Sequence, residues 1–119
     1  MTKALDALRA HTARLRNQKF VVPGVAGEDG KPFAIWFDPP SFAQGQRLKA
    51  MCVDDAGNVD EAKLTLYTVI QLARDEDGSP LFEDNGATVK FLTEDLPGAV
   101  LNPMAKAIMR VSNPADLGK

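Results

Sequence analysis

The amino-acid sequence predicts a small α+β domain that is mostly α-helical and has one N-terminal β-hairpin. Residues 20–22 and 33–37 are rich in β-branched and aromatic residues, and the stretch between them is rich in glycine and proline. From residue 41 onward, apolar residues recur instead at helical spacing, between sequences typical of helix caps. The length of 119 residues, with 45% hydrophobic and 25% charged residues, is typical of one globular domain. We expect this domain to span residues 1–113, followed by a flexible tail at 114–119.

Residues 2–17 are predicted to form an amphipathic N-terminal helix. An apolar stripe recurs at helical spacing along it. The stripe consists of Leu5, Leu8, Thr12 and Leu15. Arg9 and Arg16 flank the stripe, and we interpret the basic side chains as a solvated face, with contact to RNA or to an acidic partner as the alternative.

Residues 19–37 are predicted to form the hairpin. Two strands alone are marginally stable in water, so their apolar face must pack on helices or on another chain. That face would carry Phe20, Val22, Phe33, Ile35 and Phe37. Trp36 falls on the opposite face, where it is either covered by the N-terminal helix or exposed as an interface anchor.

Residues 41–111 are predicted to be helices joined by turns. Ser41 and Gln44 have the spacing of a capping box, which opens a helix ending near Met51. Asn58, with Glu61 at the reciprocal position, is predicted to cap the next helix, which continues to residue 74.

An acidic turn over residues 75–80 is predicted to reverse the chain and return Leu81 and Phe82 to the core. Asp84 or Asn85 then caps a short helix. Pro103 allows either a kinked helix over residues 97–111 or a single turn followed by a new helix capped by Asn102, and the second is favoured.

No catalytic, metal or cofactor site is predicted. The single cysteine, Cys52, and the single histidine, His11, exclude an intrachain disulfide and leave no Cys/His cluster for zinc. Asp75, Asp77 and Ser79 alternate as in a calcium-binding EF-hand loop, but that loop's glycine and its bidentate glutamate are both missing. The sequence also contains no glycine-rich phosphate loop. Binding, not catalysis, is the expected function.

The formal net charge of −2 does not favour nucleic acid or anionic lipid as a partner. No apolar run approaches the length of about 20 residues that spans a bilayer. The first residues lack the continuous apolar core of a signal peptide, so we expect a cytoplasmic protein.

The segment from Arg74 to Phe82, Arg-Asp-Glu-Asp-Gly-Ser-Pro-Leu-Phe, carries a resemblance to a known family. It lies after a hairpin and two helices, and it is followed by Phe91-Leu92, Leu96-Pro97 and a terminal helix with Ala107-Ile108. Over residues 18–113 this order resembles the tail assembly chaperones of long-tailed bacteriophages.

The resemblance implies a non-enzymatic assembly factor of viral morphogenesis in the host cell cytoplasm, absent from the mature virion. Such a chaperone binds the long, helical tape measure protein, keeps it soluble and helps to recruit tail tube subunits. Many copies would bind along one client, so a homo-oligomer is expected. The alternatives are a structural tail or head-tail connector subunit of a phage or prophage, and a small nucleic-acid-binding regulator that would use the basic residues near the N-terminus.

Nine apolar side chains are the candidates for contact with the client or with other copies. Their alternative role is the core, since most large apolar residues of so short a chain are needed inside. The candidates are Phe20, Phe33, Ile35, Trp36, Phe42, Leu81, Phe82, Phe91 and Leu92.

Overall fold

The computed structural model describes residues 2–27 and 29–111, so the predicted tail at 114–119 lies outside the described residues. It confirms the predicted fold class, a small α+β domain with an N-terminal hairpin. The elements follow in the order α1 (Thr2–Arg14), β1 (Gln18–Ala26), β2 (Pro32–Phe37), α2 (Phe42–Met51), α3 (Glu61–Leu72), α4 (Gly86–Lys90), the π-helix η1 (Phe91–Asp95) and α5 (Gly98–Val111).

The two strands pair antiparallel, with Phe20 opposite Ile35 and Lys19 opposite Trp36. The regular register ends after Val21, and a bulge follows before Ala26 pairs with Pro32. Pro23 lies inside this irregular stretch, where its missing N–H costs no ladder bond.

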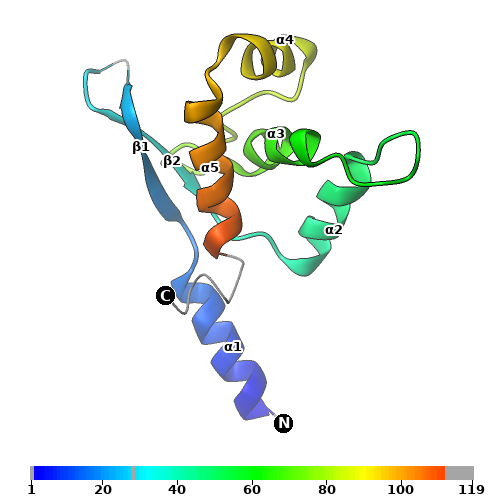
Figure 1. Ribbon diagram of the computed structural model, residues 1–119. Coiled ribbons are helices and arrows are strands. Elements are labelled where there is room, and N and C mark those ends of the chain that lie inside the picture. The colour runs from blue at the N-terminus through cyan, green and yellow to red at the C-terminus, as the bar shows by residue number, and fades with distance from the viewer. Residues whose placement is uncertain (1, 28, 112–119) are drawn as a thin grey trace.

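The helices α2 to α5 lie on one side of the hairpin, in layers (Figure 1). α5 packs on β1, α3 packs on α5, and α2 packs on the far side of α3. The main core lies between these layers. Its buried members are Val22, Ile35, Phe37, Leu48, Val69, Leu72, Ala73, Met104, Ala105 and Ile108.

A second, smaller core lies where α4 and η1 cover one end of α3. Leu66, Ile70 and Leu92 are its buried residues. Phe82 and Leu96 contact both cores, so the segment after the acidic turn joins the two clusters. The prediction that Leu81 and Phe82 return to the core is confirmed, since both are half-buried against it.

Side-chain caps begin α2 and α4 at residues that the sequence predicts. Ser41 and Gln44 form both bonds of the capping box that opens α2. Asn85, one of the two predicted alternatives, caps α4 through the N–H of Thr88.

The predicted cap of α3 is wrong. Asp60, not Asn58, accepts the Lys63 N–H and opens the helix. The reason lies in the preceding loop, where the Asp54 carboxylate accepts the N–H groups of Ala56 and Asn58. These hydrogen bonds, together with the antiparallel bridge between Val53 and Val59, hold Asn58 in a tight turn before the helix begins.

The favoured interpretation of Pro103 is also wrong. α5 continues from Gly98 to Val111 with Pro103 inside it, so no new helix starts at Asn102. The proline leaves the carbonyl of Ala99 without its helical partner and costs about 3 kcal/mol. Met104 and Ile108, which follow it, are fully buried and contribute about 1.5–3 kcal/mol each, so packing offsets the cost of the proline.

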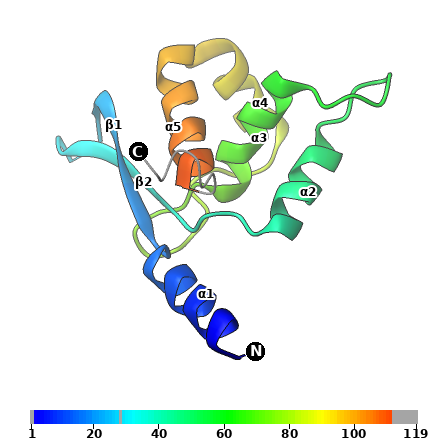
Figure 2. The ribbon, with the colours of Figure 1, turned by 60° about the horizontal axis from the view of Figure 1, so that its bottom comes forward.

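α1 projects away from the other elements (Figures 1 and 2). It ends at Arg14 rather than at the predicted residue 17, and residues 15–17 turn the chain into β1. The radius of gyration is 15.5 Å, against about 13.5 Å for a compact domain of this length. A projecting helix accounts for the excess.

Candidate protein-binding surfaces

The nine candidate contact residues separate into three groups by exposure. Ile35 and Leu92 are completely or almost completely buried, so their assignment as contact residues is corrected to core, although Leu92 also lines a groove described below. Phe42 and Phe91 are exposed, at 84% and 51%. The other five are half-buried: Phe20, Phe33, Trp36, Leu81 and Phe82.

Trp36 lies on the outer face of the hairpin, as its position in the strand predicts. α1, the helix that the sequence left as its possible cover, projects from the domain (Figure 2). Instead the ammonium of Lys19, the cross-strand neighbour, lies 5.3 Å from the centre of the indole ring. Lys19 makes a cation–π contact with the ring. Trp36 is half-buried, so it is neither fully covered nor fully exposed, which were the two alternatives that the sequence left open.

Phe42, the first residue of α2, stands at the edge of an apolar groove of about 360 Å³. We call this the Phe42 groove. Leu48 and Leu64 form part of its lining, and Lys49 is its charged residue. The lining residues are Pro40, Ser41, Phe42, Gly45, Gln46, Leu48, Lys49, Leu64 and Met109. Because so large an exposed side chain gains little from the fold itself, it is available to a partner.

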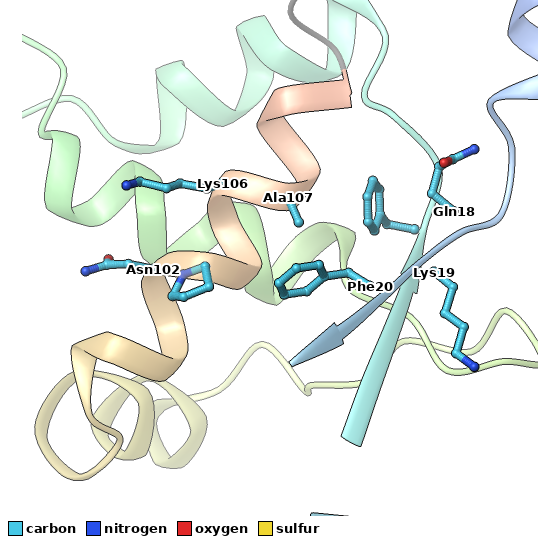
Figure 3. A pocket seen from close by; sticks show the side chains of 8 residues that line it. Gln18, Lys19, Phe20, Asn102, Lys106 and Ala107 are labelled. Carbon is cyan, nitrogen blue, oxygen red and sulfur yellow. The ribbon is translucent and has the colours of Figure 1, made fainter. Parts of the chain in front are cut away.

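A second groove, of about 370 Å³, lies between the hairpin and α5 (Figure 3). In this hairpin groove the ring of Phe20 points from β1 toward α5, where Ala107 lies, whereas the Lys19 side chain points away from it. Phe20 is therefore a wall of this groove as well as a neighbour of the core.

A third groove, of about 470 Å³, lies between α3 and the segment formed by η1 and the start of α5. We call it the α3–η1 groove. Its apolar lining includes Leu66, Leu92, Leu96 and Leu101, and Asp60 and Lys63 are its charged residues. Three more exposed carboxylates adjoin lining residues in the sequence: Glu61, Glu94 and Asp95.

Backbone groups of the hairpin edges are only partly open. The N–H and C=O of Trp36 both bond to Arg74, so that residue covers part of the outer edge of β2. It follows that Lys19, opposite Trp36, directs its backbone groups to the outer edge of β1. Pro23 and the bulge interrupt this edge, which leaves only a short stretch for pairing with another strand.

The acidic turn is held by its own hydrogen bonds. Asp75 and Ser79 pair through their backbones, and Gly78 adopts a φ of +91°, which glycine accepts without strain. The Ser79 backbone N–H, together with its hydroxyl, lowers the pKa of the Asp77 carboxyl. The alternating Asp75, Asp77 and Ser79 are thus turn residues.

The two side chains with the greatest nucleophilic or base character lie on different elements. Burial raises the pKa of the Cys52 thiol, which disfavours the reactive thiolate at the end of α2. His11 is exposed on the projecting α1. Among residues 2–27 and 29–111 no three Cys, His, Asp or Glu side chains gather closely enough to hold a metal ion. In the same part of the chain, no helix has the length and apolar character to cross a membrane.

Sequence reasoning missed two exposed apolar surfaces. Leu5 and Leu8 of α1 have no helix packed over them, although their stripe is typical of a core-facing helix. Met51 and Val53, beside the loop before α3, are also exposed. No signal in the sequence distinguishes such residues from core residues, because hydrophobic spacing does not say what lies opposite.

We compared the chain with protein-family models, with curated proteins and with solved structures, and none of the three comparisons found a match.

Proposed function

We propose that this chain is a phage tail assembly chaperone, a protein without catalytic function that binds a helical stretch of the tape measure protein. The observation that carries the proposal is Phe42, which is 84% exposed at the edge of an apolar groove. An amphipathic helix laid into such a groove buries its apolar face and uses one large anchor side chain. The order of hairpin, helices and acidic turn that resembles this family supports the same assignment.

The Phe42 groove suits one kind of client helix. Lys49 lines it, and Arg47 is exposed on the same helix, so acidic residues beside the client's apolar stripe would be favoured. Burying Phe42 on binding is worth about 1.5–3 kcal/mol, or about tenfold or more in affinity. Several such weak sites, repeated along one tape measure protein, would hold many copies through effective concentration and still allow tail tube subunits to displace them.

Co-expression with the tape measure protein of the same phage or prophage tests the proposal. We expect the chain to keep that protein soluble and to co-purify with it. Phe42→Ala should weaken capture about tenfold without changing the stability of the free chain, because the ring contributes little to the core. Phe91→Ala is the matched control, since it truncates the same exposed ring outside the groove.

Equal loss of capture in both variants, or none in either, would remove the Phe42 groove as the client site. Failure of the wild-type chain to bind or solubilise the tape measure protein would contradict the chaperone assignment itself. Mass spectrometry of purified phage particles distinguishes a chaperone from a structural connector subunit. A connector subunit would be present in fixed copy number, whereas a chaperone would be absent.

A further inference from the structure

Within the part of the chain that the structure describes, no element covers the apolar stripe of α1. All its residues from Lys3 to Arg14 are exposed, and Leu8 remains 62% exposed although it belongs to the apolar stripe. A helix of 13 residues is marginally stable in water unless an apolar face is covered. The exposed stripe is therefore a candidate surface for a partner.

The joint between α1 and β1 holds the helix away from its own domain. Asn17 adopts a φ of +56°, and its N–H donates to the Asp38 carboxylate at 2.6 Å. The Gln18 side chain donates to the carbonyl of Leu15 at 2.9 Å. Figures 1 and 2 both place α1 at the opposite end of the molecule from α4, which leads into η1. With this joint formed, α1 cannot lie in the α3–η1 groove of its own chain.

Charge separates this helix from the rest of the chain. Residues 1–17 carry four cations and one carboxylate, a net charge of +3 in a chain of net −2, so the remainder carries −5. Arg9 lies beside the exposed leucines on α1, and Arg16 follows in the turn that leads to β1. The α3–η1 groove offers the complement. Lys63 and Asp60 balance each other within its lining, and the carboxylates of Glu61, Glu94 and Asp95 beside its lining residues give it an acidic margin.

We propose that α1 is a docking arm that lies in the α3–η1 groove of a second copy of this chain. The exposed leucines of α1, Leu5 and Leu8, would cover the apolar lining of the groove, while Arg9 faces its acidic margin. The lengths agree, since the 13 residues of α1 and the 12 residues of α3 extend about 20 and 18 Å. The Phe42 groove is the less favourable site for this arm, because no carboxylate among its lining residues offsets the repulsion from Lys49.

Docking of this kind is head-to-tail. Each copy gives its arm to one neighbour and receives an arm from another, so the interface builds an open chain of copies or closes into a ring. A standard interface buries about 800 Å² on each partner, and one short helix buries less than this. Association should therefore be weak and concentration-dependent. It is self-association of this chain alone, and it does not depend on the identity of the client.

Sedimentation velocity of the purified full chain, from about 5 to about 500 micromolar, tests the proposal over the range in which a small interface dissociates. We expect oligomers that grow with concentration. Leu8→Asp should raise the dissociation constant at least about tenfold. Ala10→Asp is the matched control, because Ala10 lies about 200° around the same helix and should leave association intact.

A mixing experiment tests the pairing of arm and groove directly. The Leu8→Asp variant keeps its groove, and a Glu94→Lys/Asp95→Lys variant keeps its arm. Neither should associate alone, whereas the mixture should form a 1:1 dimer and stop there, since only one arm and one groove remain competent. Circular dichroism should show that both variants fold like the wild type, because all three substituted side chains are exposed.

Four results would overturn the proposal: a wild-type chain that is monomeric throughout the range, equal effects of Leu8→Asp and Ala10→Asp, self-association that survives Leu8→Asp, or variants that fail to pair on mixing. If the wild type is monomeric and Leu8→Asp weakens capture of the tape measure protein, α1 contacts the client and not a second copy. Phe42→Ala should leave self-association unchanged, so the proposed client site and the docking arm fail or succeed separately.

Discussion

Replacing Ile35 with alanine tests whether this side chain belongs to the core or to a contact surface. Ile35 is completely buried and lies opposite Phe20 in the hairpin, within the main core. Truncation to alanine removes three carbons, worth about 2.4 kcal/mol of transfer free energy. A residual cavity of about 50 Å³ would add about 1.2 kcal/mol. The expected loss of stability is therefore about 3.5 kcal/mol.

This loss is large beside the free energy of unfolding expected for such a domain, about 5–15 kcal/mol. In urea denaturation followed by far-ultraviolet circular dichroism, the midpoint should fall by about 1–3 M with an unchanged slope. Ile35→Val, which removes one carbon, should cost only about 0.5–1.5 kcal/mol. Phe42→Ala should change stability by less than about 0.5 kcal/mol, because its ring is exposed. A loss for Ile35→Ala no greater than that for Phe42→Ala would refute the assignment of Ile35 to the core.

Three further perturbations concern single elements. Ser41→Ala should lower the free energy of unfolding by about 1 kcal/mol in the same denaturation assay, because it removes the side-chain cap of α2, and an unchanged midpoint would contradict this. Pro103→Ala should raise it by about 1–3 kcal/mol, since the carbonyl of Ala99 regains its helical partner, and a less stable variant would show that the proline fits the fold better than alanine. The pKa of Asp77 is lower in the folded chain than in the unfolded chain. The contribution of its carboxylate to the free energy of unfolding is therefore complete above the unfolded pKa of about 3.9, and it is lost as pH falls through the folded pKa. Carboxyl NMR titration should find this lowered pKa, Ser79→Ala should raise it through loss of the hydroxyl, and an ordinary value in the wild type would count against the turn geometry.

Local chemistry explains why the sequence predicts most elements well. The capping box of Ser41 and Gln44 and the cap at Asn85 depend on residues three positions apart, so both can be recognised without knowing the tertiary structure. The alternation of apolar residues in the hairpin likewise assigns Val22 and Ile35 to one face and Trp36 to the other.

Elsewhere the competing interactions have similar energies, and local reasoning fails. Asn58 and Asp60 are both good caps, and the choice depends on the hydrogen bonds that the Asp54 carboxylate makes in the preceding loop. Pro103 ends an isolated helix, but here the burial of Met104 and Ile108 against other elements outweighs its cost.

The candidate contact residues were the least predictable. Phe42 is the first residue of α2 and Phe91 the first residue of η1, and both are exposed. Leu92, next to Phe91, is buried. Hydrophobic spacing identifies a face that must be covered. It does not tell whether the cover comes from the same chain.

The sequence by itself determined the fold class, the order of the elements, the apolar face of the hairpin and the amphipathic character of α1, because each depends on periodicity and on short-range hydrogen bonds. Only the tertiary structure decided that α1 leaves the domain, that Arg74 covers one edge of the hairpin, and which aromatic rings remain exposed. These features depend on which surfaces, distant in the sequence, meet when the layers pack, and the free energy of those contacts is not encoded in any one segment.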